Sequence, residues 1–154
     1  YKAKNSAPKH VGFQFRDFAE LIWFHEDNPS LAIQLIQEGL TLLEQKGLQK
    51  AHLFSISPLA FSVKKAHLQI LAGDIEAEEN QAFGLALKYY KKALHVNPTM
   101  MEVRLKQIRI VFDHFKDYWQ VESLCLQALK FKNPKQRRFH FEVKRYLKLA
   151  RQKK

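Results

Sequence analysis

One spacing of small and bulky residues recurs along this chain and restricts its fold more than any other feature. Ala86, Tyr90 and Ala93 stand at positions i, i+4 and i+7, which share one face of an α-helix. The same spacing recurs at Ala32, Ile36 and Gly39, and at Val121, Cys125 and Ala128. Small residues let a neighbouring helix approach closely, and the bulkier residue between them fills the gap. The spacing therefore predicts helices packed in pairs.

Helical periodicity covers most of the chain, and residues that break helices are few. Gly and Pro number five each among 154 residues, which favours long helices over a fold of many strands. Apolar residues make up 46% of the chain, enough to form a buried core. The expected elements are a lead-in at 1–11, helix pairs at 12–47, 58–97 and 99–133, and a last helix at 134–152. We predict an all-α protein of about seven helices, with 12–154 forming one domain.

Several helix ends can be predicted from local residue types. Gly47 is expected to end the second helix, and Gly73 with Asp74 the third. An exposed acidic turn is expected at Glu76, Glu78 and Glu79. Thr99 is a candidate N-cap for the fifth helix. On the first helix, Phe18 is expected to face inward with Ala19 and Ile22.

The recurring spacing resembles the tetratricopeptide repeat family. That family places Ala, an aromatic residue and Ala on the second helix of each pair, with Pro after the helix; residues 85–98 (LALKYYKKALHVNP) match this pattern. The resemblance covers roughly 13–134 as three degenerate pairs, with 134–154 as a capping helix. The first and third pairs lack the family's Trp and Gly, and about seven additional residues lie between Gly73 and Ala86. The resemblance implies an antiparallel helix-pair α-solenoid with a right-handed superhelical twist.

The same resemblance implies a non-catalytic scaffold that holds a partner peptide or helix in a concave groove. By alignment with the family, the groove residues are Lys64, His67, Lys106 and Gln107. Because this groove would mix basic and apolar side chains, the expected partner is an acidic or amphipathic segment of another protein.

Motifs for catalysis and for metal binding are absent from the sequence. It contains no Gly-rich phosphate loop, no HExxH and no Gly-x-Ser-x-Gly. Its seven histidines are scattered, and Cys125 is the single cysteine. We therefore predict neither an enzyme nor a cofactor nor a metal site. No apolar run approaches the roughly 18–20 residues that span a bilayer, and the sequence favours a soluble, cytoplasmic protein.

Positive charge gathers at the C-terminal end of the chain. Residues 132–154 carry ten Lys and Arg against one Glu, in a chain whose formal net charge is +11. The candidate docking patch is Lys135, Arg137, Arg138, Lys144, Arg145, Lys148 and Arg151. A terminal helix of a solenoid also needs a polar outer face for solubility, which would explain these residues without a ligand.

The alternative function is therefore a nucleic-acid-binding helical protein that uses this basic helix. Single-strand binding would call for exposed aromatic side chains among the basic ones. We instead expect Phe139, Phe141 and Tyr146 to pack on the sixth helix, which favours a protein partner over nucleic acid.

Overall fold

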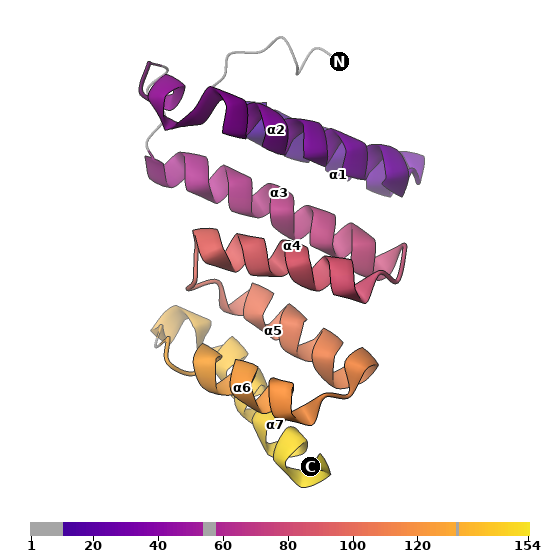
Figure 1. Cartoon of the computed structure of the whole chain (residues 1–154), viewed down its shortest axis with the longest axis vertical. Helices are drawn as coiled ribbons and strands as arrows, with labels where there is room; N and C mark the ends of the chain where they lie inside the picture. The colour runs from indigo at the N-terminus through magenta and orange to yellow at the C-terminus, as the bar shows by residue number, and fades with distance from the viewer. Residues whose placement is uncertain (1–10, 54–57, 132) are drawn as a thin grey trace. The chain divides into compact units, whose positions relative to one another are not determined.

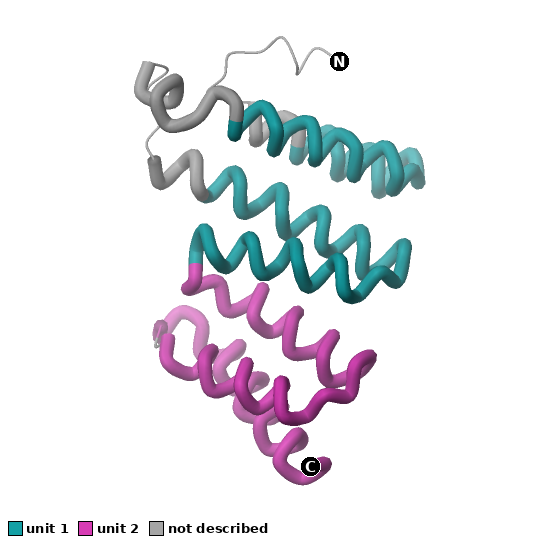
Figure 2. The backbone as a smooth tube through the Cα atoms, viewed as in Figure 1, with its two compact units in different colours: residues 1–97 teal, residues 98–154 magenta. Residues whose placement is uncertain are grey.

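The computed structural model describes residues 11–53, 58–131 and 133–154, and the side chains of 16–44, 63–131 and 133–154. These residues form seven α-helices and contain no strand (Figure 1). They belong to two compact units, residues 1–97 (unit 1) and 98–154 (unit 2) (Figure 2). The predicted all-α class and helix number are confirmed for the described residues. The expected lead-in lies outside them except for Val11, which begins the first helix.

Unit 1 contains α1 (Val11–Glu26), α2 (Pro29–Leu53), α3 (Pro58–Glu78) and α4 (Phe83–Val96). Only two residues join α1 to α2 and four join α3 to α4, so the members of each pair are antiparallel neighbours. Asp27 and Gln81 in these connections have φ of 50°, a left-handed conformation that reverses the chain. Asn28 caps α2, because its Oδ1 accepts a hydrogen bond from the backbone N–H of Leu31 at 3.1 Å.

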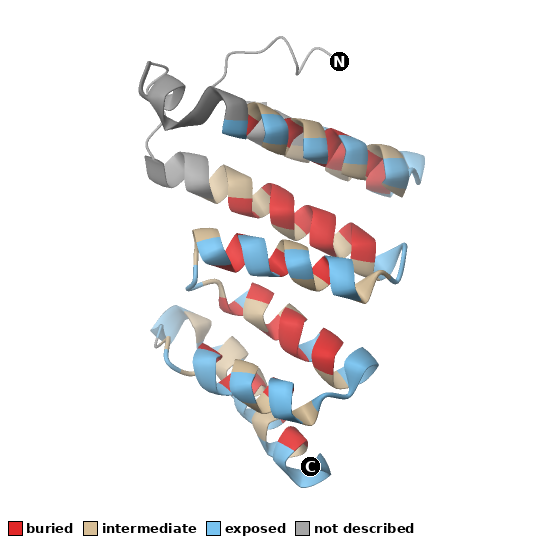
Figure 3. Ribbon diagram, in the orientation of Figure 1, coloured by how far each residue is buried: buried red, intermediate tan, exposed pale blue. Residues whose placement is uncertain are grey.

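The core of unit 1 lies among α1, α2 and α3, which all contact one another (Figure 3). Its buried apolar residues are Ala19, Ile22, Trp23, Ala32, Leu35, Ile36, Leu43, Leu68, Leu71, Ala72 and Ile75. Trp23 Nε1 donates a hydrogen bond to Glu79 Oε1 at 2.7 Å, which links α1 to the residue after α3. The inward position predicted for Phe18 is wrong, since its side chain is 42% exposed. The buried face is centred near Ala19, and Phe18 lies about 100° around the helix from it.

The α3–α4 pair packs through the recurring spacing. Ala86, Tyr90 and Ala93 are all buried, as predicted. The Tyr90 ring lies directly against Gly73 of α3, where an added Cβ would stand 2.6 Å from Tyr90 Cε1. Tyr90 Oη donates a hydrogen bond to Asp74 Oδ1 at 2.5 Å. The absence of a side chain at Gly73 therefore makes room for the tyrosine ring.

Two predicted helix ends in unit 1 are wrong. α2 continues through Gly47 to Leu53, and α3 continues through Gly73 to Glu78. A glycine inside a helix costs only about 1 kcal/mol relative to alanine, so it does not stop a helix by itself. The exposed acidic turn is consequently wrong for Glu76, which is helical and buried. The additional residues before Ala86 lengthen one helix of the pair only, since α3 has 21 residues and α4 has 14.

Unit 2 contains α5 (Met101–Ile110), a π-helical turn η3 (Val111–Phe115), α6 (Tyr118–Ala128), a 3-10 turn η4 (Pro134–Gln136) and α7 (Arg137–Lys153). α6 packs on α7, and α5 packs on both. Val121, Cys125 and Ala128 are fully buried, as their spacing predicted. The Phe112 ring meets the rings of Tyr118 and Tyr146 edge-on, with centroids 5.4 and 5.3 Å away.

The helix starts of unit 2 use different partners. Asp117 caps α6 by accepting a hydrogen bond from the backbone N–H of Gln120 at 3.1 Å. The predicted Thr99 cap of α5 is wrong: the N-cap residue is Met100, which makes no side-chain cap hydrogen bond. The backbone N–H of Met101 instead donates to Gln136 Oε1 at 3.2 Å. A residue just before α7 therefore satisfies a helix-end donor that a cap residue would otherwise satisfy.

Candidate functional site

Positive charge is divided very unevenly between the two units. Unit 1 carries 11 Lys and Arg against 10 Asp and Glu, and unit 2 carries 15 against 5. A net charge of +10 out of the total of +11 therefore belongs to unit 2. Such a concentration attracts anionic partners to this part of the chain.

Seven of the fifteen Lys and Arg residues of unit 2 lie on α7, and five of these lie along its outer face. The inner face of the helix is formed by the buried residues Val143, Tyr146 and Ala150. The exposed face, here named the α7 stripe, consists of Arg137, Arg138, Phe141, Lys144, Arg145 and Lys148. Residues 137, 141, 144 and 148 stand one helical turn apart. The stripe is about 17 Å long at the helical rise of 1.5 Å per residue.

An aromatic side chain lies in the middle of the α7 stripe. Phe141 is 70% exposed, so the prediction that it packs on α6 is wrong. It stands two residues before the buried Val143, which places it about 200° around the helix, on the opposite side. Phe139 is partly buried and Tyr146 is buried, and the Tyr146 ring meets Phe112 of η3. Phe139 and Phe141 are only two residues apart, yet the first is partly buried and the second faces solvent.

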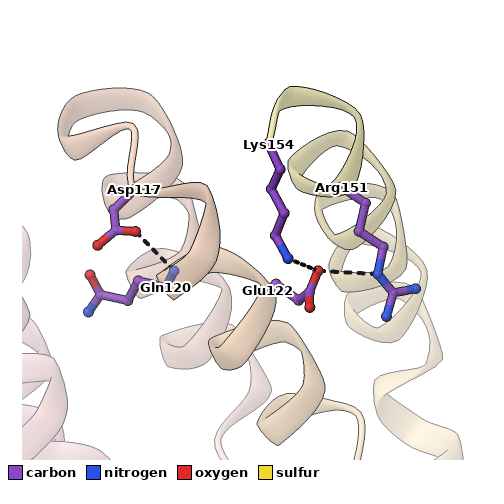
Figure 4. Close-up of polar contacts among 5 residues, drawn as sticks. All are labelled: Asp117, Gln120, Glu122, Arg151 and Lys154. Carbon is purple, nitrogen blue, oxygen red and sulfur yellow. Dashed lines mark hydrogen bonds and ion pairs between the residues drawn. The ribbon is translucent and has the colours of Figure 1, made fainter.

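Two glutamates hold part of the basic helix in place. Glu142 Oε2 lies 3.0 Å from Arg145 Nη2 and 3.9 Å from Nη2 of Arg109 on α5. Glu122 Oε2 on α6 lies 3.3 Å from Arg151 Nε and 2.5 Å from Lys154 Nζ (Figure 4). These ion pairs connect α7 to both of its neighbours, so Arg145 and Arg151 have structural partners.

The pKa values follow from these contacts. A hydrogen bond from Lys154 is the main cause that lowers the pKa of Glu122, and Arg151 adds to it. A hydrogen bond from Arg145 lowers the pKa of Glu142 in the same way. The ionised Glu142 in turn raises the pKa of Arg145. Both carboxylates therefore remain charged at neutral pH and keep their cations engaged.

The remaining cations of the predicted patch form no such ion pair, although the charge of Arg138 also helps to lower the pKa of Glu142. Among the described residues, no carboxylate lies within ion-pair distance of Lys135, Arg137, Arg138, Lys144 or Lys148. All five side chains are exposed, and Arg138 lies 5.4 Å from the centroid of the Phe139 ring. The sequence predicted one uniform patch. In the structure, Arg145 and Arg151 pair with glutamates, and the other five cations are available to an anionic ligand.

A second exposed aromatic side chain lies near the end of α7. Trp119 on α6 is 72% exposed, and Lys154 Nζ lies 3.8 Å from the centroid of its ring. Lys153 Nζ lies 5.8 Å from the centroid of the neighbouring Tyr118 ring. Most of the indole remains accessible in spite of the Lys154 contact. Trp119 was not among the residues predicted to bind a partner, although its place two residues before the inward-facing Val121 indicates an outward position.

The predicted groove residues are distributed over both units. Lys64 and His67 lie on α3 in unit 1 and are half-buried, and burial lowers the pKa of both. Arg16 of α1 lowers the pKa of His67 further, so these side chains of α1 and α3 lie close to each other. Lys106 and Gln107 lie on α5 in unit 2, where Lys106 is half-buried and Gln107 is buried.

α1 has an exposed apolar face that was not predicted from the sequence. Phe18, Leu21 and Phe24 are 42%, 48% and 66% exposed and follow one another at intervals of three residues. The Phe24 ring stacks on that of the buried Trp23, with centroids 4.5 Å apart. The interval of three was visible in the sequence, but Phe18 was assigned to the buried face together with Ala19 and Ile22, which are buried as predicted.

The described residues were also searched for metal-ligand groups and reactive thiols. They contain no group of three His, Cys, Asp or Glu side chains that could hold a metal ion. Burial raises the pKa of the Cys125 thiol to about 12, which keeps it protonated and unreactive at neutral pH. No helix in the described ranges is long and apolar enough to cross a membrane.

The chain was compared with protein families, curated proteins and solved structures. No family model, no curated protein and no solved structure matches this chain. The tetratricopeptide resemblance therefore stays a prediction from the spacing of residues. The structure adds one relevant observation, that all nine residues of the three recurring sets are buried.

Proposed function

We propose that this chain is a non-catalytic interaction module of the tetratricopeptide type. In this proposal its helix pairs stack as a right-handed α-solenoid, and α7 caps the end. The observation that carries it is the burial of all nine residues that recur at the i, i+4 and i+7 spacing. Helices that stack in such a solenoid need close approach at these positions.

The proposed partner is an acidic or amphipathic segment of another protein. α1 and α3 are the first helices of their pairs and contact each other in unit 1. They carry the basic side chains Arg16, Lys64 and His67. The exposed apolar face of Phe18, Leu21 and Phe24 supports a protein partner, since contiguous exposed apolar side chains are typical of protein-binding surfaces.

Binding of defined peptides tests this proposal. The probe is a fluorescent helical peptide with Leu along one face and Glu on its flanks, compared by anisotropy with a shuffled peptide of the same composition. We expect preferential binding of the amphipathic peptide and a loss of about tenfold in Lys64→Glu, which places like charges in contact. Lys88→Glu is the control variant. It changes the charge by the same amount at a position that is exposed on α4. Equal binding of both peptides, or equal losses in both variants, would contradict the proposal.

A further inference from the structure

The α7 stripe combines two properties that together define a ligand. Lys144, Lys148 and Arg137 lie on it with no carboxylate partner among the described residues. Phe141 lies between them with 70% of its side chain exposed to water. Exposed cations alone are explained by solubility, but a phenyl ring in their midst adds nothing to solubility.

Trp119 extends this surface beyond the end of the stripe. Arg151, one turn after Lys148, pairs with Glu122, and Trp119 stands one turn before Glu122 on α6. Lys154 contacts both Glu122 and the Trp119 ring. Phe141 and Lys154 are separated by about 20 Å along α7. Phe141, inside the stripe, and Trp119, beyond its end, are therefore two accessible aromatic rings along one basic surface of unit 2, here named the basic path, on which Arg151 and Lys154 neutralise Glu122.

We propose that this path binds single-stranded nucleic acid, with phosphates at Arg137, Lys144 and Lys148 and with bases stacked on Phe141 and Trp119. Proteins that bind single strands combine a positively charged track with aromatic side chains on which bases stack. The span of about 20 Å between Phe141 and Lys154 suits up to about six nucleotides at the 3.4 Å repeat of stacked bases, and Arg137 lies one turn beyond that span. The surface differs from the peptide site proposed on unit 1, and neither depends on the other.

Other anionic partners fit these observations less well. A duplex would satisfy the cations, but its paired bases cannot stack on protein side chains. An acidic protein segment would need apolar residues placed to meet both rings, whereas a nucleic acid strand carries an anion and a flat ring at every position. A membrane surface would need the apolar side of α7, and that side is buried through Val143, Tyr146 and Ala150.

The electrostatic part is tested by titrating the full chain into a fluorescent oligothymidylate of about twelve nucleotides at several salt concentrations. Each phosphate neutralised on a single strand contributes about 0.7 to the slope of log K against log salt. The triple variant Arg137→Gln, Lys144→Gln and Lys148→Gln should therefore reduce this slope by about 2. The control triple variant Lys88→Gln, Lys91→Gln and Lys92→Gln removes the same charge from exposed positions on α4 and should leave the slope unchanged.

The stacking part is tested with Phe141→Ala and Trp119→Ala. Each should weaken binding by about 5- to 150-fold at fixed salt, while the slope stays constant. Bound oligonucleotide should also quench the fluorescence of Trp119, and the quenching should disappear in Trp119→Phe, because the remaining Trp23 is buried. Circular dichroism melting of each variant checks folding, which substitutions at such exposed positions should not affect.

Three results would overturn this inference. Affinities within twofold of wild type in both aromatic variants would show that bases do not stack on Phe141 and Trp119. An equal fall in the slope of log K against log salt in both triple variants would show that the strand is attracted by the overall positive charge and not by the α7 stripe. Displacement of the oligonucleotide by polyglutamate, or by vesicles with anionic headgroups, as effectively as by unlabelled oligothymidylate would assign the surface to an acidic protein or to a lipid.

Discussion

Gly73 offers the sharpest test of how unit 1 is packed. It lies inside α3, where glycine is normally replaced by alanine with a gain in stability. In this helix, however, the Tyr90 ring occupies the space that a side chain would need. A Cβ at position 73 would lie 2.6 Å from Cε1 and 2.9 Å from Cδ1 of that ring. Gly73→Ala should therefore destabilise the protein.

The magnitude follows from three contributions. Alanine gains about 1 kcal/mol of helix propensity over glycine. Displacing the Tyr90 ring within a packed interface costs about 1–3 kcal/mol. The same displacement weakens the hydrogen bond from Tyr90 Oη to Asp74, and bonds to charged groups contribute about 1.5–3 kcal/mol. If the hydrogen bond is lost in full, the net loss in the free energy of unfolding is about 1.5–5 kcal/mol, and a partly kept bond makes it smaller. The sign is opposite to that of propensity alone.

Urea denaturation followed by circular dichroism measures this change. Gly84→Ala is the matched control, since Gly84 lies in α4 and an added Cβ there would meet nothing within 4 Å. That variant should be neutral or more stable by up to about 1 kcal/mol.

A second comparison isolates the contact itself. In a Tyr90→Leu background the ring is gone, so the loss caused by Gly73→Ala should shrink or reverse, as expected for residues in direct contact. The packing described for α3 and α4 would be refuted if Gly73→Ala stabilised the wild-type chain as much as Gly84→Ala does.

Two further predictions concern unit 2. Cys125, whose pKa burial raises to about 12, should react with Ellman's reagent at neutral pH only as the protein unfolds; rapid reaction of the native chain would contradict its core position. The pKa of Glu122 is lowered by Lys154 and Arg151, so its contribution to stability is complete above the ordinary carboxyl pKa of 4.5 and is lost as the pH falls through the lowered value. Glu122→Gln should thus make the melting temperature less sensitive to acidification, and an unchanged pH profile would count against these ion pairs.

The helices and their inward faces were largely predictable because they depend on local spacing. Ala86, Tyr90 and Ala93 are buried because small residues at i and i+7 suit a close helix contact, whatever lies across it. The helix ends at Gly47 and Gly73 were mispredicted because a local breaker was given more weight than the packing of the residues beyond it. Ile75 and Glu76, just after Gly73, are buried against the rest of the unit.

The site was less predictable, because it depends on contacts between residues far apart in sequence. Arg151 and Glu122 are 29 positions apart, and nothing local to α7 indicates that this arginine has a partner. Phe141 faces solvent because of the register of α7, which is set by what Val143 and Tyr146 meet on its neighbours. Composition located the basic segment, but only the structure separates its cations by what they contact.

The uneven division of charge also has a consequence for folding. With a net charge of +10 in 57 residues, unit 2 resembles a short polycation, and its like charges repel one another most when the chain is compact. Anions that gather on the α7 stripe reduce this repulsion, so dissolved salts should stabilise the folded state of unit 2. Unit 1 has nearly balanced charge, so they should affect its stability little. A polyanion bound to the stripe adds its binding free energy to the folded state. Binding and folding of unit 2 are thereby coupled through its charge.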